Sequence, residues 1–316
     1  MSVGTRPLVP SRLTPGSLVD AAHGVRRSPR TLVGSYLALT KPRIVELLLI
    51  TTVPTMVLAA DGWPGWGLIV VTLVGGSLAA GGANALNMYV DRDIDAKMRR
   101  TQGRPLVTGA IAPRNAVIFA GVLELAAFVV LAVGANLLAA TLALAATAFY
   151  VGVYTIWLKR TSTHNIVIGG AAGAVPVLVG WSAVTDSLDW PAVVLFAAMF
   201  FWTPPHFWAL AIRYADDYRA AEVPMLPVVV PLREAAKQMV GYTIALVAST
   251  LVLIPVGNLG WLYAVAAVVL GALFLGGTIA LVNRPTPAAS MRVFTFSITY
   301  VTLLFGAMTL DVLLLT

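Results

Sequence analysis

Three polar side chains, Asn87, Asp91 and Asp95, stand four residues apart at the end of a long uncharged stretch of the sequence. In a helix each step of four residues drifts only about 40° around the axis, so the three would form one stripe. Asp93 would lie on another face. Mg²⁺ usually takes one or two carboxylates and completes its shell with water and substrate phosphate oxygens. The spacing therefore predicts a magnesium site that also receives a phosphorylated substrate.

Basic residues crowd the loop that follows this stripe. Lys97, Arg99, Arg100 and Arg104 all fall within it, and arginine binds phosphate oxygens through paired hydrogen bonds. The alternative is a helix end that is simply solvated, which is common for a single aspartate. Three aligned ligands beside a basic loop favour the functional interpretation.

A second charged cluster covers residues 213–227 and includes Arg213 and Asp217. It follows the segment WTPPHFWAL, whose two prolines must kink or break a helix beside His206. A lone histidine in an apolar segment is structural about as often as functional, because neighbouring helices can bind it through hydrogen bonds. Both interpretations of His206 stay open.

A third group of polar residues lies in YTIWLKRTSTHN, residues 154–165, and offers Tyr154, Lys159 and Arg160. Lys159 and Arg160 alone could be ordinary positive anchors at a membrane surface. We include all three as candidates because they follow an apolar stretch, as the first two clusters do.

The elements that position these clusters are membrane helices. Of the 316 residues, 59% are hydrophobic and only 11% charged, whereas a soluble domain is about half apolar and a quarter charged. Apolar stretches of about 18 residues or more can cross a membrane. We predict an all-α, polytopic bundle with nine transmembrane helices at 43–60, 67–90, 115–134, 136–157, 165–184, 189–212, 236–256, 259–282 and 291–314.

The basic residues alternate between the two sides of this bundle. All 21 Lys and Arg lie in the N-terminal segment or around the loops after the second, fourth, sixth and eighth spans. The positive-inside rule then predicts a cytoplasmic N-terminus and an outside C-terminus. Residues 1–35 read as a disordered basic cytoplasmic tail, and residues 36–316 as the bundle. Because the net charge of +7 is arranged in this way, we expect a lipid bilayer as partner and no nucleic acid.

Acids, bases and aromatics at one mouth of an apolar bundle suit a substrate with a diphosphate head and a long apolar tail. Mg²⁺ and basic side chains would stabilise a leaving diphosphate, and an allylic tail would leave as a carbocation. Walls that exclude water would protect that cation. The chain has no cysteine, which excludes thiolate nucleophiles and Cys-ligated metals.

The segment NMYVDRDIDAKMRRTQGRPL resembles the N-x-x-x-D-x-x-x-D signature of the UbiA superfamily of intramembrane prenyltransferases. Further stretches at 39–52, 157–181 and 202–229 resemble its protoheme IX farnesyltransferase (heme O synthase) branch. The resemblance runs from about residue 36 to the end and implies a UbiA-type domain with Mg²⁺ as cofactor.

The resemblance also implies roles for individual residues. Asn87, Asp91 and Asp95 match the first metal-diphosphate motif, and Asp217 matches the last acid of the second motif, where the first acid is replaced by Arg213. Positions that bind the diphosphate or close the site fall on Arg99, Arg104, Lys159 and Arg160, and the pattern at the first helix includes Lys41 and Arg43.

The implied reaction transfers farnesyl from farnesyl diphosphate to a vinyl group of heme b, giving heme O, on the cytoplasmic side of the plasma membrane. Asp91, Asp95, Asp217 and His206 are the candidate catalytic residues, with His206 placed near the heme or the water that completes the reaction. Partner proteins of heme synthesis or of terminal-oxidase assembly are also expected.

Two other functions remain open. A relative that prenylates an aromatic quinone precursor is disfavoured by the TPPHFW run and by the missing first acid of the second motif. A transporter is disfavoured because its polar site would lie near the membrane midplane. The interiors of the predicted spans are nearly bare of charge. The exceptions are Glu46 and Glu124, and neither has an assigned role.

Overall fold

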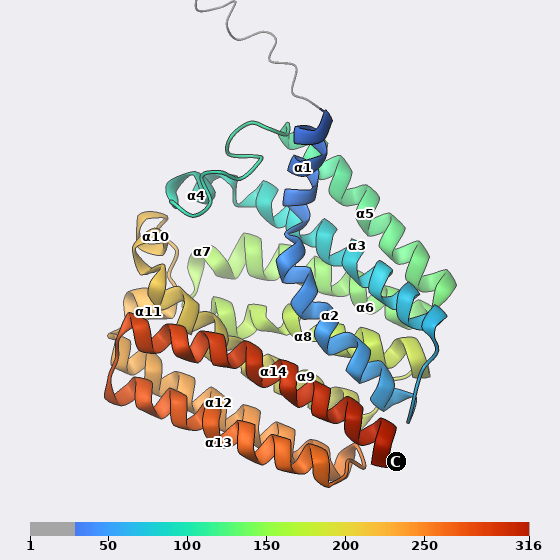
Figure 1. The fold of residues 1–316 in the computed structure, drawn as a ribbon. Helices are drawn as coiled ribbons and strands as arrows, with labels where there is room; N and C mark the ends of the chain where they lie inside the picture. The colour runs from blue at the N-terminus through green and yellow to red at the C-terminus, as the bar shows by residue number, and fades with distance from the viewer. Residues whose placement is uncertain (1–28, 316) are drawn as a thin grey trace, which may run out of the picture.

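The structure, a computed structural model, describes residues 29–315, without the side chains of residues 29–30 and 43–49. Within that part of the chain all regular structure is helical, as predicted (Figure 1). Residues 1–28 of the predicted tail lie outside the described residues. Residues 29–35, which we placed in the tail, instead form the start of helix α1 (Pro29–Thr40). Further along α1, Tyr36 packs on the bundle, with its ring centroid 5.0 Å from that of Phe119.

Eight helices among the described residues are long and apolar enough to cross a membrane. They are α3 (Trp66–Val90), α5 (Pro113–Gly134), the continuous α6–η3–α7 rod (Leu137–Thr161), α8 (Asn165–Thr185), α9 (Trp190–Arg213), α12 (Leu232–Val256), α13 (Trp261–Asn283) and α14 (Pro287–Leu315). The first predicted span, 43–60, coincides with α2 (Pro42–Ala59), a helix of 18 residues.

The long helices pack largely in chain order. Each helix from α5 to α14 contacts the next long helix, and α14 packs against α2, which in turn packs against α3 and closes the bundle. The short helices α4 (Arg92–Lys97), α10 (Ala215–Ala220) and α11 (Leu226–Val229) gather at one end, which we call the capped end (Figure 1). The predicted first and second charged clusters are therefore at the same end of the bundle.

Small residues let these helices approach closely. A Cβ added to Gly180 of α8 would lie 2.8 Å from the carbonyl oxygen of Thr52 in α2. Gly75 of α3 and Gly134 of α5 pack in the same way against Leu131 and Val71. Helices in lipid associate through such tight packing because the bilayer supplies little hydrophobic driving force between them.

The rod from Leu137 to Thr161 widens from an α-helix to a π-helix over η3 (Phe149–Leu158) and returns to α-helix at α7 (Lys159–Thr161). The hydroxyl of Thr155 donates to the carbonyl of Tyr150, five residues back, at 2.9 Å. The sequence predicted a helix here but not this widening. Such π segments are frequent at functional sites.

Candidate active site

The predicted stripe of Asn87, Asp91 and Asp95 crosses the junction between two helices. Helix α3 ends at Val90 and α4 begins at Arg92, yet the backbone bonds Asp91 N–H to Asn87 C=O (2.9 Å) and Asp95 N–H to Asp91 C=O (2.8 Å) continue across it. All three side chains are buried, with exposures of 2%, 0% and 2%. The junction therefore keeps the three ligand candidates together while the chain changes direction.

Each of the three faces a cation from a different part of the chain. Lys159 of α7 contacts Asp91 Oδ2, and Arg104 Nη1 lies 2.5 Å from Asp95 Oδ2. Lys41 Nζ donates to Asn87 Oδ1 at 2.8 Å. Two buried carboxylates are costly unless each has such a partner. The structure thus brings the predicted bases Lys41, Arg104 and Lys159 onto the predicted stripe.

Lys41 occupies the junction between α1 and α2, where its backbone is left-handed (φ 50°). Such a conformation costs a non-glycine residue about 1–3 kcal/mol and is often found at functional sites. Burial, together with the nearby positive charges of Arg104 and Lys159, lowers the pKa of Lys41 to about 7. The side chain of Arg43, two residues on, lies outside the described residues.

Among the side chains that the structure describes, one oxygen of the stripe has no hydrogen-bond partner. Asp91 Oδ1 is buried and unpartnered, although Arg160 Nη2 lies 3.8 Å away. An unsatisfied buried oxygen is costly and often marks the position of an ion or ligand. No cluster of three or more acidic, His or Cys side chains that could hold a metal occurs in the described part of the chain. Two carboxylates and an amide oxygen nevertheless fit Mg²⁺, which draws its remaining ligands from water and substrate phosphates.

Arg160 is held by Asp93, the aspartate that the helical pattern had set aside. Its Nη1 and Nη2 donate to the two Asp93 oxygens, both at 2.7 Å, and Nη2 also donates to the Val90 carbonyl at 3.1 Å. The Arg160 hydrogen bonds lower the pKa of Asp93 to about 2. Asp93 is therefore ionised at neutral pH and acts on a residue of the predicted site.

Sequence reasoning missed Thr155, a buried hydroxyl of the π-helix. Asn87 Nδ2 donates to Thr155 Oγ1 at 3.0 Å and to Asp91 Oδ2 at 2.8 Å. The predicted Tyr154 beside it is buried and stacks on Tyr150, with ring centroids 5.4 Å apart. A threonine in an apolar run gave no signal, because membrane helices commonly bury threonine hydroxyls against their own backbone.

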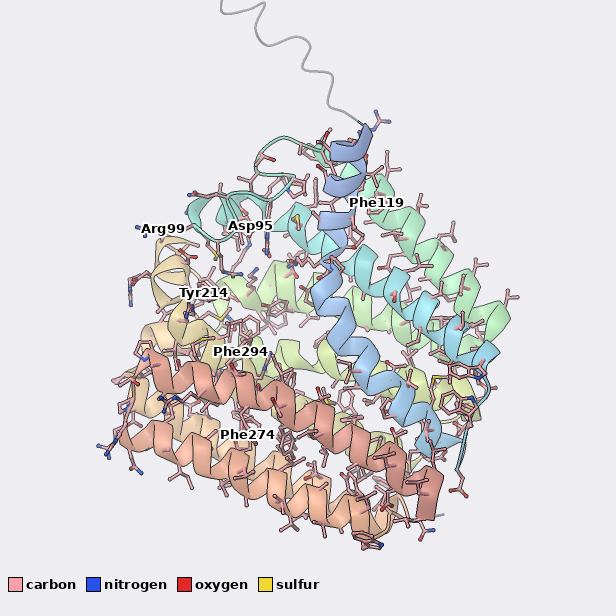
Figure 2. The ribbon with its side chains drawn as sticks, in the orientation of Figure 1. Asp95, Arg99, Phe119, Tyr214, Phe274 and Phe294 are labelled. Atoms are coloured by element: carbon pink, nitrogen blue, oxygen red, sulfur yellow. The ribbon has the colours of Figure 1, made fainter. Side chains whose placement is uncertain are left out.

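The second cluster supports the loop of the first. Asp217 of α10 accepts hydrogen bonds from the backbone N–H groups of Arg99 (3.3 Å) and Arg100 (3.4 Å). Arg100 Nη2 also donates to the Tyr218 hydroxyl at 3.1 Å. The side chains of Arg99 and Arg213 are exposed, and Figure 2 shows Arg99 at the outer edge of the capped end. The structure therefore gives Asp217 a loop-holding contact.

His206 lies apart from the acidic stripe, between α9 and α14. Its ring stacks between Trp202 (centroids 4.1 Å) and Phe294 (4.8 Å), and Nδ1 is 2.6 Å from Ser297 Oγ. The Trp202 indole also donates to the Ser297 carbonyl at 2.9 Å. His206 is thus held rigidly, and its Nδ1 is occupied by a hydroxyl of the neighbouring helix.

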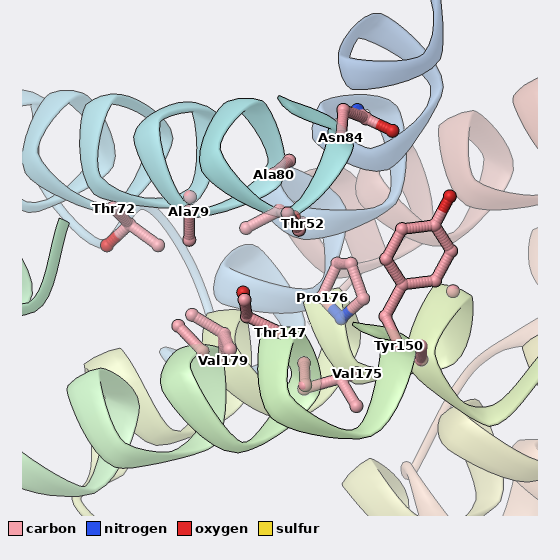
Figure 3. Close-up of a pocket in the computed structure, with 16 residues that line it drawn as sticks. Thr52, Thr72, Ala79, Ala80, Asn84, Thr147, Tyr150, Val175, Pro176 and Val179 are labelled. Carbon is pink, nitrogen blue, oxygen red and sulfur yellow. The ribbon is translucent and has the colours of Figure 1, made fainter. Parts of the chain in front are cut away.

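A cavity of about 180 Å³ extends into the bundle between α2, α3, α6 and α8. Figure 3 shows Asn84 and Tyr150 at one end and Thr72 and Val179 at the other. Asn84 lies one turn before Asn87, so the cavity begins next to the acidic stripe. Its other lining residues are mainly small or apolar: Thr52, Gly76, Ala79, Ala80, Ala83, Ala143, Ala146, Thr147, Ala172, Gly173, Val175 and Pro176.

The intramembrane Glu124 lies behind the wall of this cavity. Its Oε1 accepts a hydrogen bond from Thr147 at 3.1 Å and packs against Gly82 of α3. It therefore ties α5 to α3 and α6. The side chain of Glu46 lies outside the described residues.

The chain matches the UbiA prenyltransferase family over residues 48–303. It belongs to this family. A protoheme IX farnesyltransferase of Pseudarthrobacter chlorophenolicus is 52% identical to it over 282 residues, which cover 88% of each chain. The prediction of a UbiA-type prenyltransferase, made from the motif at Asn87, is confirmed.

Solved structures share the UbiA fold with this chain. A digeranylgeranylglyceryl phosphate synthase structure matches with a TM-score of 0.74 at 16% identity, covering 89% of this chain and 99% of its own. A UbiA homologue from Archaeoglobus fulgidus, bound to GPP and Mg²⁺, matches with a TM-score of 0.61 at 18% identity, covering 87% and 99%. These likenesses confirm the helical membrane fold.

Proposed function

We propose that this UbiA prenyltransferase transfers the farnesyl group of farnesyl diphosphate to a vinyl group of heme b and so makes heme O. The observation that carries the proposal is the buried acid stripe, surrounded by cations, at the end of an apolar cavity. Relatives named protoheme IX farnesyltransferase, about half identical over most of the chain, support heme as the acceptor.

Asn87, Asp91 and Asp95 are the residues that would hold Mg²⁺. When bound, the metal supplies charge that stabilises the departing diphosphate. The UbiA homologue solved with GPP and Mg²⁺ supports this assignment. The unpartnered Oδ1 of Asp91 is the atom with the clearest need for such a ligand.

The bases around the stripe bind the diphosphate oxygens. Lys159 and Arg104 already face the Asp91 and Asp95 carboxylates, and Arg160 lies beside them. Positive groups fixed in this way stabilise the negative charge that develops on the leaving diphosphate. Exposed Arg99 and Arg213 at the capped end close the site over the substrate, while Asp217 holds the loop and can contribute an oxygen to a metal.

The apolar cavity receives the farnesyl tail and keeps water from the cation. The vinyl carbon of heme forms a bond to C1 of the farnesyl group as diphosphate leaves with the electron pair of the C–O bond. Water then adds to the cation left on the heme side chain and loses a proton, giving a hydroxyethylfarnesyl group. His206 is the candidate for heme contact through Nε2, since Nδ1 is occupied by Ser297.

In this proposal α2 is the ninth span, the basic tail and the capped end face the cytoplasm, and the C-terminus lies outside. The alternation of basic loops supports this orientation in the plasma membrane. It places Asp91 and Asp95 where water-soluble Mg²⁺ can reach them. A heme-delivery or terminal-oxidase assembly partner would meet the same face.

Membranes that contain the protein, incubated with heme b, farnesyl diphosphate and Mg²⁺, test the proposal when the pigments are analysed by mass spectrometry. We expect heme with a hydroxyethylfarnesyl group. A parallel reaction offers 4-hydroxybenzoate as acceptor. Prenylated 4-hydroxybenzoate without farnesylated heme would overturn the choice of acceptor and favour a quinone-precursor enzyme.

A further inference from the structure

Both hydrogens of Arg160 Nη2 are already used. One is donated to Asp93 Oδ1 at 2.7 Å and the other to the Val90 carbonyl at 3.1 Å. An arginine Nη carries only two N–H donors. Asp91 Oδ1 lies 3.8 Å from the same nitrogen, beyond hydrogen-bond distance, and has no hydrogen-bond partner among the described residues. The buried oxygen and the nearby cation thus stay apart because the donors of that nitrogen point elsewhere.

We propose that Asp93 is a positioning residue that keeps Arg160 away from Asp91 Oδ1, so that this oxygen stays available to Mg²⁺. The inference rests on the proposed metal-diphosphate site. Asp93 is the only group that takes hydrogen bonds from both terminal nitrogens of Arg160 within the described residues. Without it, one Nη2 hydrogen is released and the guanidinium needs to move by only about 1 Å to reach normal hydrogen-bond distance.

Asp91 and Asp93 compete unequally for Arg160, and this explains why Asp93 needs two hydrogen bonds to hold the guanidinium. Asp91 is fully buried, whereas 60% of the Asp93 side chain is exposed. A cation is attracted more strongly to a buried carboxylate than to a solvated one, because water screens the second pair. Two parallel hydrogen bonds from Arg160 to Asp93, together with the Val90 carbonyl, offset this difference.

A simpler interpretation is that the pair only fastens α4 to α7. The two interpretations differ in what Arg160→Gln alone does to metal binding. If the pair only fastens the two helices, this substitution should weaken metal binding as much as Asp93→Ala does; if Asp93 acts by holding Arg160 away from Asp91, it should weaken metal binding much less. If Asp93 acts through Arg160 on the metal site, its loss matters only while Arg160 is present. If Asp93 ligates the metal or stabilises the fold by itself, its loss matters in either background.

The test is a double-mutant cycle on the purified full chain in detergent. The quantity measured is the affinity for Mn²⁺, determined by electron paramagnetic resonance in the presence of inorganic diphosphate. Mn²⁺ replaces Mg²⁺ as a spectroscopic probe, and the measurement uses neither heme nor turnover. We expect Asp93→Ala to weaken Mn²⁺ binding about tenfold, the usual effect of one charged hydrogen bond. In an Arg160→Gln background the same substitution should change it by less than about twofold.

Asp216→Ala is the matched control, because Asp216 pairs with Arg219 at 2.6 Å on the surface of α10, away from the stripe. It should bind Mn²⁺ as the native protein does. Equal weakening by Asp93→Ala in both backgrounds, or no weakening in the native one, would overturn the role of Asp93. If the Mn²⁺ measurements behave as expected but no farnesylated heme forms, only heme as the acceptor is refuted. The two proposals can therefore fail separately.

Discussion

Replacing Thr155 by valine removes a single hydroxyl from the site at nearly constant volume. That hydroxyl donates its one hydrogen to the Tyr150 carbonyl, so it must act as the acceptor of the hydrogen bond that Asn87 Nδ2 donates. The acceptor therefore helps to orient the Asn87 amide, with Oδ1 toward Lys41 and the metal position. In Thr155→Val one amide hydrogen of Asn87 is left without an acceptor, and the amide keeps only its hydrogen bonds with Asp91 and Lys41.

The expected loss follows from that one contact. A buried donor left unsatisfied costs about 1–3 kcal/mol. If about 1–2 kcal/mol of this cost raises the free energy of the transition state, kcat/KM for farnesyl transfer falls about 5- to 30-fold. The half-saturating Mg²⁺ concentration should rise as well, because Asn87 no longer presents its oxygen in a fixed direction. Thr155→Ser keeps the hydroxyl and should recover most of the activity.

Thr243→Val separates this effect from a general loss of stability. Thr243 is equally buried, and its hydroxyl donates at 2.8 Å to the Met239 carbonyl within α12. Both valine variants should lower the thermal melting temperature in detergent, but only Thr155→Val should change kcat/KM and the Mg²⁺ dependence. Native kinetics in Thr155→Val, or equal slowing in Thr243→Val, would refute the reasoning.

Three further outcomes are expected. Asp91→Ala should lower turnover more than about a hundredfold while the protein stays in the membrane, and near-native product formation would mean that the metal binds elsewhere. Gly76→Leu should shift the preference from farnesyl to geranyl diphosphate, because a Cβ at Gly76 meets open space in the cavity wall and the larger side chain would shorten the cavity. Gly121→Leu, on the lipid-facing side of α5, is the control. Unchanged selectivity in Gly76→Leu would mean that the tail binds elsewhere. His206→Ala should raise KM for heme without changing KM for farnesyl diphosphate, and a change in both would indicate a packing role between Trp202 and Phe294.

The spans were predictable because lipid thickness limits the length of an apolar helix. The predicted 67–90 and 165–184 agree closely with α3 and α8. Errors fell where a helix continues beyond the apolar stretch. Helix α14 begins at Pro287, four residues before the predicted span, and α1 begins inside the predicted tail. Hydropathy detects the part of a helix that lies in lipid, not its polar first turns.

The π-helix and its hydroxyl were beyond this kind of prediction. Whether a turn of helix takes i→i+4 or i→i+5 bonds depends on small energy differences set by neighbouring helices. The contact of Thr155 with Asn87 joins residues 68 positions apart, and periodicity within one helix carries no information on such a pair. The same limit applies to Asp93, whose partner Arg160 is 67 positions away.

The partners of the acid stripe, in contrast, follow from an argument about charge. Placing Asp91 and Asp95 inside the bundle requires cations that are also drawn inside, because a buried carboxylate without a partner is unstable. In a chain with 11% charged residues, few bases adjoin apolar stretches closely enough to enter with them. Lys41 and Lys159 are two such bases, and both are found on the stripe. Burial of the acids therefore selects the bases, and the cations that neutralise the stripe would be positioned to receive the diphosphate if Mg²⁺ took their place on the carboxylates.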